Sequence, residues 1–172
     1  ILDIRVANDK GFSGSSVLAQ GIIEAVDRGA QIINISMGSY DDSVALREAV
    51  AYASQKEVFI VAAAGNDGYN ELAFPAAIPS VISAGAVDAK GKQAYFSNSG
   101  SNLDITAPGV DLPTAWDSNK AASVSGTSQS AAVVTGVIAA DLTLGVSHAQ
   151  LLATLQKNAK VTGAPVSKVG AG

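Results

Sequence analysis

The sequence predicts an α/β domain with a mostly parallel β-sheet, on two observations. Three short apolar runs, residues 1–7, 31–36 and 57–62, have the length and composition of strands, and the latter two resemble buried parallel strands. Residues 17–29 and 41–54 lie between them and carry apolar side chains at helical spacing. A strand–helix–strand–helix–strand order favours right-handed crossovers onto a parallel sheet.

The boundaries of these elements follow from local signals. Residues 8–16 form a loop of small polar residues, and Ser16 is the expected N-cap of the first helix, which ends at Gly29. The helix at 41–54 begins with acidic residues, which its positive N-terminal end favours.

The second half of the chain has a different character. Residues 80–87 are predicted to form a strand, and residues 93–109 short extended pieces separated by turns. A helix rich in small residues is expected at 127–142, with Gly145 after its end. Ser147 and Gln150 have capping-box spacing and predict one more helix. Without repeats or linkers, residues 1–172 are interpreted as one domain.

Composition excludes several function classes. The chain has 172 residues, 48% of them hydrophobic and 15% charged, so it can bury a core. A net charge of −4 disfavours nucleic-acid binding, and no apolar stretch approaches the roughly 20 residues of a membrane span. The absence of cysteine excludes thiol catalysis and disulfides, and the absence of a G-x-G-x-x-G or P-loop pattern disfavours nucleotide binding.

Unusual loops follow three of the predicted strands, at residues 36–39, 64–68 and 125–128. In open α/β sheets, sites form at the carboxyl ends of strands. Ser128 opens a helix, where free N–H groups stabilise an anion, and Asn66 offers an amide at a turn flanked by glycine. A hydroxyl, an amide donor and a helix N-terminus are the parts of an oxyanion hole. Taken singly, such a serine is ordinarily a helix cap and such an asparagine a turn residue.

A series of motifs in the same order resembles the C-terminal part of the catalytic domain of subtilisin-like serine peptidases (subtilases). These motifs are residues 32–38 (IINISMG), 61–68 (VAAAGNDG), 74–82 (FPAAIPSVI), 85–88 (GAVD), 96–100 (FSNSG), 104–109 (DITAPG) and 126–130 (GTSQS). Each is moderately specific, and their order over about a hundred residues makes the resemblance strong.

The resemblance implies a three-layer, doubly wound α/β fold that lacks its N-terminal part, and a serine endopeptidase activity. Ser128 corresponds to the nucleophile and Asn66 to the oxyanion donor. Two backbone segments are expected to flank the substrate as cleft edges. These are Ser36, Met37 and Gly38, and Ala63, Ala64 and Gly65.

Several features depart from the family pattern. Ala132 and Val133 replace the Pro and His that usually follow the nucleophile, and that His is not the catalytic one. The D-[ST]-G and H-G-T motifs of the catalytic Asp and His are absent. His148, the one histidine, follows a whole helix after Ser128 and is not expected to act as its base.

The catalytic Asp and His are therefore expected on an N-terminal segment of the same peptidase, as a partner of this chain. The chain is interpreted as a piece of a longer protein that is inactive alone and acts on peptide or protein substrates. The alternative is a catalytically dead pseudopeptidase, or a fragment that holds or regulates a peptide without cutting it.

The resemblance also implies an extracellular or secreted location. No cofactor is required, but a weakly bound calcium or sodium ion is expected at four residues. These are the carbonyl donors Ala76, Ile78 and Val81, and the carboxylate of Asp104. One carboxylate gives a site of low charge and low affinity.

Overall fold

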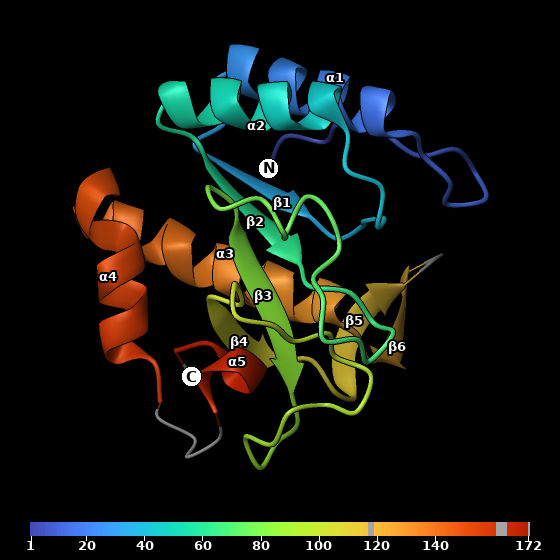
Figure 1. Cartoon of the computed structure of the whole chain (residues 1–172), viewed down its shortest axis with the longest axis vertical. Coiled ribbons are helices and arrows are strands. Elements are labelled where there is room, and N and C mark those ends of the chain that lie inside the picture. Colours follow the sequence, from blue (N-terminus) through green and yellow to red (C-terminus); the bar gives the residue numbers. More distant parts are fainter. Residues whose placement is uncertain (117–118, 161–164, 172) are drawn as a thin grey trace.

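The core of the molecule is a four-stranded parallel sheet (Figure 1), seen in a computed structural model that describes residues 1–116, 119–160 and 165–171. Its strands are β1 (Ile32–Ile35), β2 (Phe59–Ala63), β3 (Ile82–Val87) and β4 (Ile105–Pro108). They are hydrogen-bonded in the order β1-β2-β3-β4. The predicted α/β class with a mostly parallel sheet is confirmed.

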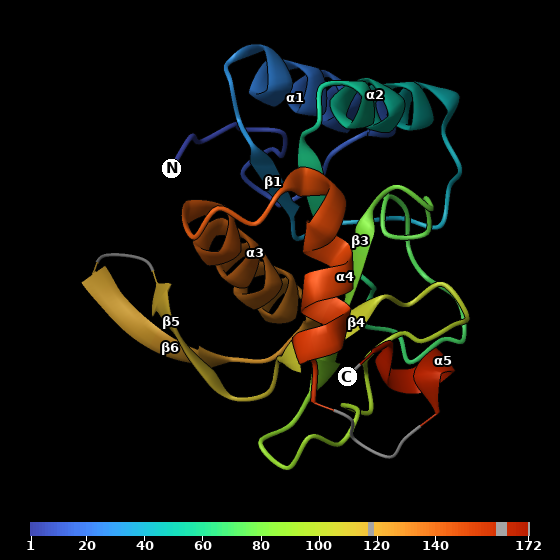
Figure 2. The same cartoon turned by 90° about the vertical axis from the view of Figure 1, so that its left-hand side faces the viewer.

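Helices cover both faces of this sheet and give three layers (Figures 1 and 2). Helices α1 (Ser15–Asp27) and α2 (Val44–Gln55) pack on one face, and α3 (Thr127–Thr143) and α4 (His148–Asn158) on the other. Strand β2 alternates its side chains between the two cores, so that Ile60 faces α1 and α2 while Val61 faces α3. No helix in the described part of the chain is long and apolar enough to cross a membrane.

Two elements had no sequence signal strong enough to predict them. An antiparallel hairpin of β5 (Leu112–Trp116) and β6 (Lys120–Val124) extends from the sheet and leads into α3 (Figure 2). A short helix, α5 (Val166–Val169), lies near the C-terminus. Both hairpin strands are largely exposed, so neither shows the apolar alternation of a half-buried strand.

The two edges of the parallel sheet differ. The C-terminal segment covers β4, because Ala171 N donates to Asp104 O at 2.9 Å and Thr106 Oγ1 donates to Val169 O at 3.2 Å. This approach needs Gly170, since a Cβ there would lie 2.4 Å from the carbonyl carbon of Asp104. The outer edge of β1 has no strand beside it in the described structure.

The prediction of a strand at residues 1–7 is wrong, because these residues have no strand partner and form no ladder. They run past β1 and contact α1 instead, where a Cβ on Gly21 would lie 2.3 Å from Val6 Cγ1. An alternating apolar pattern becomes a strand only where a neighbour supplies the hydrogen bonds. The first helix also starts earlier than predicted, with Gly14 and not Ser16 as its N-cap.

A side-chain link joins the starts of β3 and β4. Asp104 Oδ2 accepts hydrogen bonds from Ser83 N and Ser83 Oγ, both at 2.9 Å. Ser83 is fully buried, and its Oγ also accepts from Asp104 N at 2.9 Å. The carboxylate therefore satisfies a main-chain donor that has no access to water.

We predict that Asp104→Ala lowers the free energy of unfolding by about 1–3 kcal/mol, because it leaves the buried N–H of Ser83 unpaired, while Ser83 Oγ keeps Asn102 O as an acceptor at 2.8 Å. Asp104→Asn keeps an acceptor oxygen and should lose less. Glu71→Ala, which removes an exposed carboxylate, is the control and should change stability by less than about 0.5 kcal/mol. Calorimetry of the variants checks this, and equal stabilities for Asp104→Ala and Glu71→Ala would contradict it.

Candidate active site

Ser128 is the second residue of α3, at the carboxyl edge of the parallel sheet. The first four N–H groups of a helix have no partner within the helix, and that of Ser128 is one of them. Gly126, the N-cap, is held by its own N–H, which donates to Gly109 O at 2.8 Å. The helix therefore presents a hydroxyl and a free N–H at its positive end.

Asn66, in the loop after β2, lies against this helix start. Its Oδ1 accepts hydrogen bonds from Thr127 N at 2.8 Å and from Thr127 Oγ1 at 2.9 Å. A main-chain N–H can only donate, so the oxygen of the Asn66 amide must face α3. The Nδ2 group then points away from Thr127 and has no acceptor among the described residues. Asn66 thus contacts the residue directly before Ser128, and the structure brings Asn66 and Ser128 close together.

Thr127 is a further residue of the candidate site, one to which the sequence pattern assigned no role. It is fully buried, and both its N–H and its hydroxyl donate hydrogen bonds to Asn66 Oδ1. Its Oγ1 also accepts a hydrogen bond from Gly65 N at 3.3 Å. A threonine directly before the serine was visible in the motif, but its role depends on a contact across 61 residues of sequence.

The hydroxyl of Ser128 has no base beside it in the described structure. Ser128 Oγ donates to Ser36 O at 3.3 Å, and Ser36 Oγ donates to Ser128 O at 3.1 Å. Ser128 is half-buried, and no described carboxylate contacts it. His148 begins α4, after the far end of α3, and a helix of 17 residues is about 25 Å long. The main chain at His148 therefore lies at the wrong end of α3 to serve Ser128.

The six residues predicted as cleft edges lie beside Ser128 and Asn66, but they differ in what their backbones can offer. Ser36, Met37 and Gly38 follow β1 and are exposed or half-buried. Ala64 is fully buried, donates to Ala84 O at 3.0 Å and accepts from Ala73 N at 2.9 Å. Its backbone groups are already paired, as are those that Ala63 contributes to the sheet next to β3. Gly65 is paired as well, because its N–H donates to Thr127 Oγ1 at 3.3 Å and its carbonyl accepts from Asn98 N at 3.0 Å, so of the two segments the first is the one with main chain open to a substrate.

A tyrosine links the loops that follow β1 and β2. Tyr40 OH donates to Asp67 Oδ2 at 2.5 Å, and its ring lies 5.5 Å from that of Tyr69. Burial, together with the hydrogen bond to Asp67, raises the pKa of Tyr40 above its ordinary value. The hydroxyl therefore stays protonated and keeps donating to Asp67 well above neutral pH.

Some of the oxygen atoms predicted to bind a cation already accept hydrogen bonds within the protein. Asp104 Oδ2 accepts from Ser83, and Ile78 O accepts from Val81 N at 2.9 Å. Ala76 and Val81 retain carbonyls, but calcium takes six to eight oxygen ligands, so these residues do not fit a calcium site without several waters. No group of three or more acidic or histidine side chains among the described residues could hold a metal. The cation site stays a prediction.

Comparison of the sequence with known proteins gives a consistent result. A sequence model described as the subtilase family matches residues 1–172. A thermophilic serine proteinase from Bacillus sp. (strain AK1) is 37% identical over 164 residues, which are 95% of this chain and 41% of that protein. Subtilisin DY from Bacillus licheniformis is 39% identical over 140 residues, which are 79% of this chain and 51% of that protein. The chain thus spans about half the length, or less, of these relatives.

Solved structures agree with the sequences. The patellamide maturation protease PatA matches with a TM-score of 0.85 and 34% identity over 96% of this chain and 67% of its own. The prenylagaramide maturation protease PagA matches with a TM-score of 0.85 and 29% identity over 94% of this chain and 65% of its own. Together with the order of the strands and the serine at the start of α3, these matches show that the chain belongs to the subtilase family.

Proposed function

We propose that this chain carries the nucleophile and the oxyanion donor of a serine endopeptidase, and that a further segment of the same peptidase supplies the catalytic Asp and His. The observation that supports this most directly is the orientation of Asn66. Thr127 holds its Oδ1, so its Nδ2 remains as a free donor beside the free N–H of Ser128.

In the proposed reaction, Ser128 Oγ attacks the carbonyl carbon of a peptide bond and gives its proton to the imidazole supplied by the other segment. The carbonyl oxygen becomes an oxyanion, which accepts hydrogen bonds from Asn66 Nδ2 and Ser128 N. The imidazolium then protonates the leaving amine, and water releases the acyl group by the same steps in reverse.

The substrate is proposed to be an extended peptide. Its main chain would lie along residues 36–38, where β1 ends and backbone groups are open. Ala63 and Ala64 would contribute a wall rather than hydrogen bonds, because their own backbones are paired within the sheet. We also propose an extracellular location, which rests on the likeness to the subtilisins.

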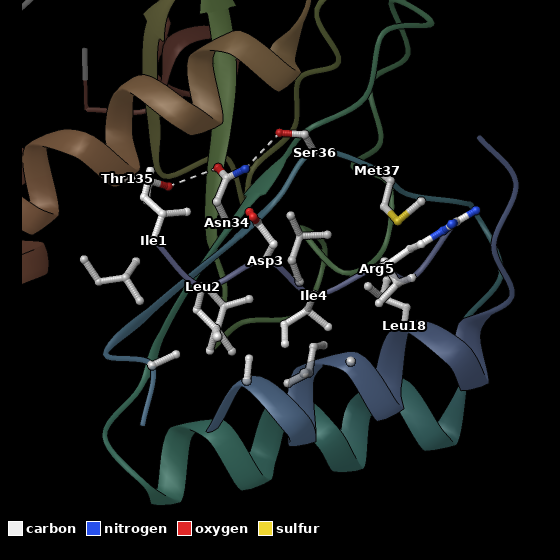
Figure 3. A pocket seen from close by; sticks show the side chains of 18 of the residues that line it. Ile1, Leu2, Asp3, Ile4, Arg5, Leu18, Asn34, Ser36, Met37 and Thr135 are labelled. Carbon is white, nitrogen blue, oxygen red and sulfur yellow. Dashed lines mark hydrogen bonds between the residues drawn. The ribbon is translucent and has the colours of Figure 1, made fainter. Parts of the chain in front are cut away.

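The place for the missing segment is proposed to be a groove of about 920 Å³ beside β1 (Figure 3). One wall is the outer edge of β1 and another is residues 1–7. Each helical layer turns a stripe of small and apolar residues towards the groove: Leu18, Gly21, Ile22 and Ala25 from α1, and Ala132, Thr135 and Ala139 from α3. Within each stripe the residues follow one another mostly at intervals of three or four, as on helices that pack against a sheet.

The shape of this groove fits an added strand. It lies in the plane of the sheet between two helical layers, and strands are about 4.8 Å apart. An extended segment there would pair with the free edge of β1 and reach the carboxyl end of the sheet, beside Ser36 and Ser128. An obligate interface of this kind buries more than roughly 2,000 Å² in total.

We expect Ser128→Ala, in the assembled enzyme, to abolish labelling by a fluorophosphonate probe and to lower kcat by several orders of magnitude, because the neighbouring hydroxyl of Thr127 is fully buried and donates to Asn66 Oδ1. Ser123→Ala, which removes an exposed hydroxyl in β6, is the matched control and should label as the wild type. Undiminished labelling of Ser128→Ala would assign the nucleophile to another serine.

We further expect the 172-residue chain alone to show no turnover of a chromogenic peptide, and the segment carrying Asp and His to restore it in trans. The reason is that Ser128 lacks a base among the described residues. A chain that turns over substrate alone would contradict this, and a complex that forms without turnover would favour the pseudopeptidase alternative.

A pair of variants locates the contact. Ala132→Glu places a charge in the groove and should weaken binding of the segment by at least about tenfold in a titration. Ala51→Glu makes the same change on the exposed face of α2 and should bind normally. Equal binding by the two variants would place the segment elsewhere.

A further inference from the structure

Asn98, in the loop between β3 and β4, is a fully buried polar residue that the proposed reaction does not use. Its Oδ1 accepts hydrogen bonds from Asp67 N and Tyr69 N, both at 3.0 Å. Its own N–H donates to Gly65 O at 3.0 Å. These contacts fall on both sides of Asn66 in the sequence, and none falls on Asn66 itself.

The loop that Asn98 holds has no regular secondary structure. Residues 66–70 are all exposed and belong to no helix or strand. Gly65 has a φ of +114°, and a Cβ there would lie 2.3 Å from Asn98 Nδ2, so Asn98 approaches the loop more closely than a residue with a side chain would allow. Apart from Asn98, the main chain of this loop is held by Gly68 N, which donates to Phe96 O at 2.7 Å, and by Tyr69 O, which accepts from Ser99 N at 2.9 Å.

The other end of the Asn98 amide reaches the opposite loop. Asn98 Nδ2 donates to Tyr40 OH at 2.8 Å, and Tyr40 in turn donates to Asp67. Asn98 therefore connects the loop after β2 to the loop after β1, the two loops that flank Ser128. A side chain with both a donor and an acceptor is needed to make these contacts at once.

We propose that Asn98 is a positioning residue for the oxyanion donor: it fixes the main chain at Gly65 and Asp67 so that Asn66 Nδ2 faces the oxyanion. Thr127 holds the amide of Asn66 from one side, and Asn98 holds its backbone from the other. Asn98 touches neither substrate nor Ser128. This inference rests on the proposed function, because it assigns Asn98 a part in the same reaction.

The effect of Asn98 should appear in the chemical step and not in substrate binding. An oxyanion exists only in the transition state and the intermediates beside it, so a misplaced donor lowers kcat while KM changes little. In subtilisin itself, loss of the oxyanion-hole asparagine costs about 10²–10³ in kcat. A donor that is displaced but present should cost less than this.

The test uses the assembled enzyme and four variants: Asn98→Ala, Asn66→Ala, the double variant and Ser99→Ala. We expect Asn98→Ala to lower kcat at least tenfold with KM within about threefold of the wild type. The double variant should have the kcat of Asn66→Ala alone, because Asn98 acts through Asn66. Ser99 is also buried, and its hydroxyl contacts Tyr69 O and Asn70 Oδ1 further along the loop but neither Gly65 nor Asp67, so Ser99→Ala should keep the wild-type kcat even if its Tm falls.

If Asn98→Ala does not fold, the kcat of Asn98→Asp provides the test instead. The carboxylate retains an acceptor for Asp67 N and Tyr69 N, so its kcat should stay within about threefold of the wild type even if its Tm falls. A tenfold loss of kcat in this variant would overturn the proposal.

Two other outcomes would also overturn it: a wild-type kcat for Asn98→Ala, or losses in the double variant that multiply. If either of these results is found while Ser128→Ala is inactive, the role of Asn98 is contradicted but the proposed function is not. Activity in Ser128→Ala would instead contradict the proposed function itself, and with it the role of Asn98.

Discussion

The hydrogen bonds from Thr127 to Asn66 Oδ1 are the interaction on which the proposed site depends. They join the loop after β2 to the start of α3, two parts of the chain that are 61 residues apart. Because Thr127 is buried, its N–H and hydroxyl need partners inside the protein, and Asn66 provides both with one oxygen. The same bonds decide which end of the amide faces outward. Because the buried N–H and hydroxyl of Thr127 need an acceptor, they orient the Asn66 amide so that its Nδ2 is a donor near Ser128.

The groove beside β1 has a comparable physical origin. A sheet with helices on both faces is stable when strands fill the middle layer, and here α1 and α3 extend past the last paired strand. The edge of β4 is covered by residues 165–171, but none of the strands that the structure describes pairs with the outer edge of β1. An open edge of this kind favours pairing with another segment. In the described part of the chain, Ser128 has no base beside it and the outer edge of β1 has no strand beside it, and the segment proposed above would fill both places.

The sequence predicted the sheet, the helices and the meeting of Asn66 with Ser128, because each of these follows from local pattern or from the order of family motifs. It failed at residues 1–7, where the apolar alternation is present but the segment lies across the groove from β1 and forms no ladder with it. It also missed the roles of Thr127 and Asn98, whose importance comes from contacts with residues distant in sequence. Asparagine in a turn sequence has many uses, and only its burial against Gly65 and Asp67 distinguishes this one.

The central claim is that Ser128 Oγ and Asn66 Nδ2 act on the same carbonyl group. A crystal structure of the assembled enzyme after reaction with a peptidyl phosphonate tests it most directly. The account predicts phosphorus bonded to Ser128 Oγ, with its oxygen about 3 Å from both Asn66 Nδ2 and Ser128 N. A phosphonate bonded to another residue, or an oxygen that points away from Asn66, would contradict it.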